Sequence, residues 1–173
     1  MKAVVVYESH WGNTAAIARA IASGLGPDTP VLATDEATDS VLADADLIVA
    51  GAPVIAFRLA TDSMRKNIAN DAHDAPRQPD LTHPSMRAWL DGIPAGRGFA
   101  AAFETRIHWS PGGATGAIER GLRAAGYRHV TKGRRFFVTG SYGPLREGEL
   151  DAARAWGSEL AQTLQATHVA AAL

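Results

Sequence analysis

The residues best suited to hold a ligand lie in the segment Ser9–Thr14, between an apolar run and an amphipathic pattern. A helix that begins here offers unpaired N–H groups and the positive end of its dipole. Gly12 allows the backbone to approach a ligand closely, and the Ser9 and Thr14 hydroxyls can donate hydrogen bonds. The segment therefore predicts a phosphate site without lysine or arginine. The alternative is that Asn13 or Thr14 only caps the helix.

Two other nucleotide-binding loops do not fit this segment. A dinucleotide-binding loop needs Gly-x-Gly-x-x-Gly, and here only Gly12 is present, although Asp35 and Glu36 stand where a ribose-binding acid could lie. The P-loop ends in Gly-Lys-Ser/Thr, which is also missing. A phosphoacceptor receiver domain needs an aspartate at the end of the third strand, where this chain has Gly51-Ala52-Pro53, a predicted turn.

Short apolar runs alternate with helical patterns along the chain, which indicates βαβ crossovers and a parallel sheet covered on both faces. We therefore predict an α/β fold: a doubly wound five-stranded parallel sheet of order 2-1-3-4-5 in a three-layer sandwich. A ligand would bind at the carboxyl ends of the first and third strands. The predicted strands are Ala3–Tyr7, Val31–Ala33, Leu47–Ala50, Phe99–Phe103 and Phe136–Val138, and the clearest helical patterns cover 17–25, 118–125 and 150–164.

The segment between Thr61 and Gly98 interrupts this alternation. It contains four prolines, at 76, 79, 84 and 94, which interrupt two short helical pieces around Met64–Ala69 and Ser85–Leu90. We interpret the segment as an elaborated crossover, because the fourth strand still needs the earlier strands as neighbours. Residues 1–173 are thus predicted to form a single domain, for which 173 residues suffice.

The composition excludes several classes of function. The chain contains no cysteine, which rules out disulfides, cysteine nucleophiles and cysteine-ligated metals and agrees with a cytoplasmic location. The first apolar run is too short for a signal peptide, and no run approaches the roughly 18 residues of a membrane span. A net charge of −1 predicts no nucleic-acid partner. The histidines lack helical metal-binding spacing, and His73, His83 and His129 are expected at the surface.

The segment Val5–Thr14, followed by Ala18 and Ile21, resembles the FMN-phosphate signature of the flavodoxin family. In words, the signature is two apolar residues, an aromatic, any residue, Ser or Thr, two variable positions, a small residue, any residue, Thr, and later an alanine and an aliphatic. Every constrained position matches. The resemblance implies a flavodoxin-like fold and non-covalent FMN, with the phosphate at Ser9–Thr14 and the ring between the loops after the third and fourth strands.

At His10 and Trp11 this chain departs from flavodoxins, which usually carry further Ser or Thr there; His10 could replace one donor, with added electrostatic help when charged. The flavin ring needs flat apolar faces, for which Trp109 is the first choice and Phe57 or Ile55 the second. Thr105 and Arg106 are placed to offer main-chain hydrogen bonds to its pyrimidine edge. No catalytic side chain is predicted, and the cofactor-binding residues predicted are Ser9, His10, Trp11, Gly12, Asn13, Thr14, Pro53, Val54, Ile55, Phe57, Thr105, Arg106, Trp109 and Gly112.

Three functions remain open at this point. The first is an FMN-binding redox protein that passes electrons to or from a protein partner or a small acceptor. The second is an NAD(P)H-dependent quinone or flavin reductase, favoured by Trp11, by Arg58 and Arg106 near the expected ring, and by a net charge far less acidic than that of electron-carrying flavodoxins. The third is a binding module that has lost FMN, suggested by the substitutions at His10, Trp11 and 54–55.

Overall fold

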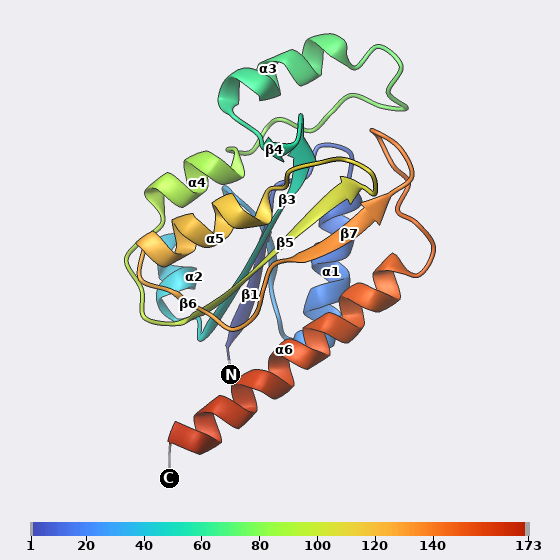
Figure 1. The fold of residues 1–173 in the computed structure, drawn as a ribbon. Coiled ribbons are helices and arrows are strands. Elements are labelled where there is room, and N and C mark those ends of the chain that lie inside the picture. The colour runs from blue at the N-terminus through green and yellow to red at the C-terminus, as the bar shows by residue number, and fades with distance from the viewer. Residues whose placement is uncertain (1, 172–173) are drawn as a thin grey trace.

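A mainly parallel sheet forms the centre of the molecule (Figure 1). The computed structural model describes residues 2–171. The strands follow the order β2-β1-β3-β5, β6 and β7 both pair with β5, and β4 pairs with β3. The predicted doubly wound order is therefore confirmed as β2-β1-β3-β5-β7. The strands are β1 (Ala3–Tyr7), β2 (Val31–Ala33), β3 (Leu47–Ile55), β4 (Arg58–Leu59), β5 (Phe99–Ile107), β6 (Arg128–His129) and β7 (Arg134–Val138).

Helices cover both faces of the sheet and one of its ends (Figure 1). α1 (Asn13–Leu25) and α6 (Glu149–Ala171) lie on one face, and α2 (Asp39–Ala43), α4 (Met86–Gly92) and α5 (Thr115–Ala124) lie on the other. α3 (Asp62–Asp71) lies beyond the carboxyl ends of the strands. Within the described residues, no helix is both long and apolar enough to cross a membrane.

Alternate residues of the central strands face opposite helical layers. Val5 and Val49 pair across β1 and β3 and belong to the core under α1 and α6. Val4 and Ile48, one residue earlier on each strand, belong to the core under α4 and α5. All four side chains are buried, which explains why the first and third strands are continuous apolar runs rather than alternating ones.

β3 continues past Gly51, where a turn was predicted, and ends at Ile55. The turn prediction was wrong because Gly51 serves packing: a Cβ there would lie 2.3 Å from the ring of Phe103 on the neighbouring strand. Pro53, opposite Thr105 on β5, is tolerated because β1 has already ended on the other side of β3. A proline without an N–H loses no ladder bond at such an open edge.

The chain reverses at Ala56 and Phe57 instead, whose φ values are 43° and 70°. Positive φ at two successive residues suits the tight hairpin that joins β3 to β4. The N–H of Gly113 donates to the Phe57 carbonyl at 2.9 Å, and Gly112, at φ 71°, comes so close that a Cβ would lie 2.0 Å from that oxygen. The hairpin is thereby attached to the loop that follows β5.

β5 also runs longer than predicted, to Ile107, so that Thr105 and Arg106 lie in a strand rather than in a loop. The charged side chains of Glu104 and Arg106 are buried in this part of the strand. They pair with each other at 2.9 Å, which makes their burial tolerable and lets the strand continue. The two short helical pieces of the crossover are confirmed as α3 and α4.

Candidate functional site

A cavity of about 460 Å³ opens at the carboxyl ends of the central strands, where the loops singled out from the sequence meet. The carboxyl edge of a doubly wound sheet is where ligands bind in this class of fold. Every residue predicted to bind the cofactor lines this cavity except Gly12 and Gly112: the wall contains Ser9, His10, Trp11, Asn13, Thr14, Pro53, Val54, Ile55, Phe57, Thr105, Arg106 and Trp109.

The two glycines shape the loops instead of lining the wall. Gly12, at φ 88°, precedes α1, and its N–H donates to Ser9 Oγ at 3.1 Å. Gly112 packs against the hairpin carbonyl of Phe57. Both positions lie in the left-handed region of φ, which glycine adopts at little cost.

The first loop presents the start of α1 to the cavity. Among the described residues no side chain caps α1, so neither Asn13 nor Thr14 acts as the helix cap considered above. Asn13 Nδ2 donates to the Tyr142 carbonyl at 3.1 Å, and Thr14 Oγ1 lies 2.7 Å from Thr105 Oγ1. The first-turn N–H groups therefore remain open to a ligand that accepts hydrogen bonds, as a phosphate does.

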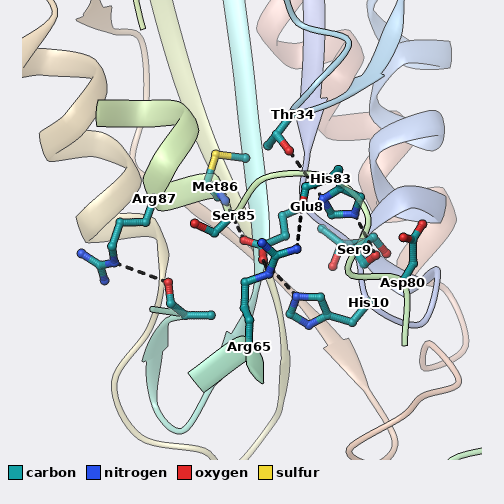
Figure 2. Close-up of polar contacts among 12 residues, drawn as sticks. Glu8, Ser9, His10, Thr34, Arg65, Asp80, His83, Ser85, Met86 and Arg87 are labelled. Atoms are coloured by element: carbon teal, nitrogen blue, oxygen red, sulfur yellow. Dashed lines mark hydrogen bonds and ion pairs between the residues drawn. The ribbon is translucent and has the colours of Figure 1, made fainter. Parts of the chain in front are cut away.

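Glu8, directly before this loop, has a fully buried carboxylate with three partners (Figure 2). Its Oε1 lies 3.0 Å from both His10 Nε2 and Arg65 Nε, and its Oε2 accepts from the Met86 N–H at 2.8 Å. A buried carboxylate is tolerated only when paired and hydrogen-bonded in this way. Because Arg65 is on α3 and Met86 begins α4, Glu8 fastens the crossover to the first loop. Sequence reasoning did not single out Glu8 or Arg65.

The rest of the crossover also contacts the backbone of the first loop. The Asp80 N–H donates to the His10 carbonyl at 2.8 Å, and Arg77 donates to the Trp11 carbonyl. The Thr82 hydroxyl and N–H donate to the Asp80 carboxylate and hold its pKa below the ordinary value. These contacts fix the outer side of the loop while its inner side faces the cavity.

His83 is buried beneath the same loop, so the prediction that it lies at the surface was wrong (Figure 2). Its Nε2 lies 3.4 Å from the Ser9 carbonyl, and its own carbonyl accepts from Arg65 Nη2 at 2.6 Å. The burial follows from the path of the crossover, which no local pattern reveals. Among the side chains that the structure describes, no group of three or more potential metal ligands lies together.

Two buried ring nitrogens of the first loop, His10 Nδ1 and Trp11 Nε1, have no hydrogen-bond partner among the described residues. The Trp11 ring contacts the rings of His10 and Tyr142 edge-on, with centroids 5.7 and 4.9 Å away. Buried polar atoms are nearly always satisfied, so these two nitrogens are candidates for hydrogen bonds to a ligand that the cavity binds.

The remaining walls are largely apolar. Trp109, with 75% of its surface exposed, and Phe57, with 52%, stand at the rim, and the half-buried Val54 and Ile55 lie deeper on β3. α3 covers the cavity with residues that sequence analysis did not assign to the site, because a helical pattern does not tell which strand end the helix will cover. The wall residues from α3 and its end are Met64, Asn67, Ile68, Asp71 and Ala72, and those after β7 are Ser141 and Tyr142.

A second buried carboxylate, Glu104, fixes the loop after β5. Its Oε2 accepts from the Ala114 and Thr115 N–H groups at 2.6 and 2.9 Å, and its Oε1 pairs with Arg106 Nη1 at 2.9 Å. Arg106 also donates to the Gly112 carbonyl at 2.8 Å. The Arg106 guanidinium is therefore held by the protein and its charge is offset, although it lines the cavity.

Comparison with known proteins identifies the fold. No family model and no curated protein matches this chain. Solved structures match over nearly its whole length: a flavodoxin from the domain Archaea has a TM-score of 0.66 at 22% identity, covering 95% of this chain and 99% of that one. Flavodoxin 1 from Bacillus cereus has a TM-score of 0.64 at 18% identity, covering 94% of this chain and 98% of that one. A WrbA-like flavodoxin from Agrobacterium tumefaciens has a TM-score of 0.55 at 17% identity, covering 95% of this chain and 98% of that one. The protein has a flavodoxin-like fold.

Proposed function

We propose that this protein binds FMN non-covalently in the cavity and passes electrons to or from a protein partner or a small acceptor. The observation that carries the proposal is the convergence of the three predicted loops on one cavity, with the start of α1 left uncapped at its phosphate end. The flavodoxin structures support the same assignment, since they share this fold.

The residues present fit FMN. The loop Ser9–Thr14 would hold the phosphate through the first-turn N–H groups of α1 and the Thr14 hydroxyl. Trp109 and Phe57 would cover the ring faces at the rim, while β3 and β5 supply the deeper wall. Bound FMN would supply reversible electron and hydride transfer, and the side chains around it would bind, orient and shield it from water.

The absorption spectrum of the purified protein tests this proposal, with a fluorescence titration of the apoprotein with FMN as the quantitative measurement. We expect flavin bands, or stoichiometric quenching of FMN fluorescence on reconstitution. A colourless protein that leaves FMN fluorescence unchanged would contradict the proposal and favour a binding module without cofactor.

The reductase remains a second candidate because α3 covers the cavity and Trp11 lies in its wall. A covered flavin site suits a small acceptor, and the WrbA-like flavodoxin shares the fold. Steady-state oxidation of NADH or NADPH with a quinone decides between the two candidates. Turnover well above that of free FMN supports the reductase, and turnover equal to that of free FMN rejects it.

We further propose that residues 1–173 act as one domain in the cytoplasm. The crossover supports a single domain, since Arg65 and Met86 both bond to Glu8 directly after β1. The lack of cysteine is compatible with a cytoplasmic location. Limited proteolysis tests the domain assignment: one resistant fragment spanning both ends of the crossover is expected, and separate stable halves would contradict it.

A further inference from the structure

Resting on the proposed function, we infer that His10 recognises the phosphate as an imidazolium, so that FMN binding is coupled to a proton on Nδ1. His10 is 2% exposed, lines the cavity, and carries one partnered and one unpartnered ring nitrogen. His10 is thus a titratable side chain in an otherwise uncharged phosphate loop, at a position where flavodoxins usually carry Ser or Thr.

The contact with Glu8 determines which proton His10 carries. Nε2 lies 3.0 Å from Glu8 Oε1, and a carboxylate that is also paired with Arg65 can only accept (Figure 2). Nε2 must therefore be the donor. In a neutral imidazole this tautomer leaves a lone pair on Nδ1, which would repel the oxygens of a phosphate dianion. Only the doubly protonated ring can donate to Glu8 and to the ligand at once.

The charged groups around His10 allow its ring to be protonated without a large imbalance of charge. Glu8 contributes a negative charge at the end of β1, and Arg65 on α3 offsets it. The crossover supplies Asp80, whose N–H bonds the His10 carbonyl, and it also supplies His83 and Arg77 on the neighbouring carbonyls of the first loop. A bound phosphate dianion would add the negative charge that an imidazolium at His10 then balances. Charge-assisted hydrogen bonds to phosphate are about twice as strong as neutral ones.

The inference predicts how affinity depends on pH. Above the pH at which the free protein loses the Nδ1 proton, binding must take up a proton. The FMN affinity then falls with rising pH by up to about tenfold per pH unit. The second ionisation of a phosphate monoester has a pKa near about 6 and is nearly complete above about pH 7.5, so measurements from about pH 7.5 to 9 isolate the histidine. Riboflavin, which has no phosphate, should show no such slope.

The experiment titrates the apoprotein with FMN and with riboflavin across this range by fluorescence, and measures proton uptake calorimetrically in buffers of different ionisation enthalpy. The wild-type protein should take up close to one proton with FMN near the upper end of the range. His10→Gln should weaken FMN binding about ten- to hundredfold at the low end and lose the slope. His73→Gln, at an exposed histidine of the crossover, is the matched control and should behave as wild type.

The outcomes separate the inference from the proposed function. If wild-type protein binds FMN without proton uptake and with a flat pH profile, the inference is wrong while the FMN assignment stands. If His10→Gln weakens riboflavin and FMN equally, Nδ1 accepts from a ribityl hydroxyl instead, and the inference is again wrong. If neither flavin binds wild-type protein, the proposed function fails and the inference fails with it.

Discussion

Replacing Glu8 by Gln should cost more stability than any other single change of charge at the first loop. The carboxylate is fully buried and serves His10, Arg65 and the Met86 N–H. The amide keeps one acceptor, enough for Met86, but turns an NH₂ donor toward two other donors. It also leaves Arg65, itself 9% exposed, without its counter-charge. Breaking a buried ion pair in this way costs about 3–5 kcal/mol.

For a chain of this size the loss corresponds to a melting temperature roughly 6–20 °C lower. Urea denaturation of the apoprotein measures the free energy of unfolding directly. Asp44→Asn is the matched control, because it makes the same chemical change in an ion pair with Lys2 whose side chains are both 73% exposed. Such a surface pair contributes at most about 1 kcal/mol.

The double variant Glu8→Gln/Arg65→Met should recover part of the loss, because it removes the stranded cation along with its partner. A loss of stability for Glu8→Gln as small as that for Asp44→Asn would mean that the buried Glu8 carboxylate contributes no more than a surface charge. Strict additivity of the two substitutions would mean that Glu8 and Arg65 do not interact.

Three further predictions concern packing and the cavity wall. Gly24→Ala should destabilise by about 1–3 kcal/mol in urea denaturation, because its Cβ would lie 2.0 Å from the Arg154 carbonyl of α6. Gly92→Ala should change the stability little, because no atom of the described residues beyond the adjoining backbone lies within 4 Å of the added Cβ, and equal losses for the two variants would contradict the packing argument. Thr14→Val should weaken FMN binding about tenfold in the fluorescence titration through loss of a hydroxyl at the phosphate end; unchanged affinity would remove Thr14 from the site. Trp109→Ala should leave unfolding nearly unchanged, because the side chain is 75% exposed, but weaken flavin binding about two- to tenfold; an affinity equal to wild type would mean that Trp109 does not stack.

The strand order and the cavity position could be predicted because the signals for them are local. The run Ala3–Tyr7 is β-branched and continuous, as a strand buried on both faces must be, and α1 follows it with a regular apolar face ended by Gly26. Parallel strands joined by crossovers bring their carboxyl ends together, so the loops after β1, β3 and β5 had to meet. Their residues consequently line one cavity.

The predictions from sequence were wrong where contacts between distant segments determine the local structure. The run Gly51-Ala52-Pro53 contains residues that are common in turns. Gly51 nevertheless lies in a strand, where the Phe103 ring fills the space that a side chain would occupy. The predicted fourth strand ends at Phe103, but β5 continues beyond it because Glu104 and Arg106 neutralise each other inside the sheet. His83 and Arg65 lie far from the first loop in sequence and become part of its support only because the crossover folds back over it. The spacing of residues along the sequence does not reveal such long-range contacts.

A crystal structure of the protein grown with FMN shows whether FMN binds in the cavity at the carboxyl ends of the strands. We expect one FMN in the cavity, with its phosphate against Ser9–Thr14 and His10 Nδ1 and its ring between Trp109 and the β3 hairpin. Crystals that remain free of ligand at saturating FMN, or that hold FMN away from the first loop, would contradict this expectation.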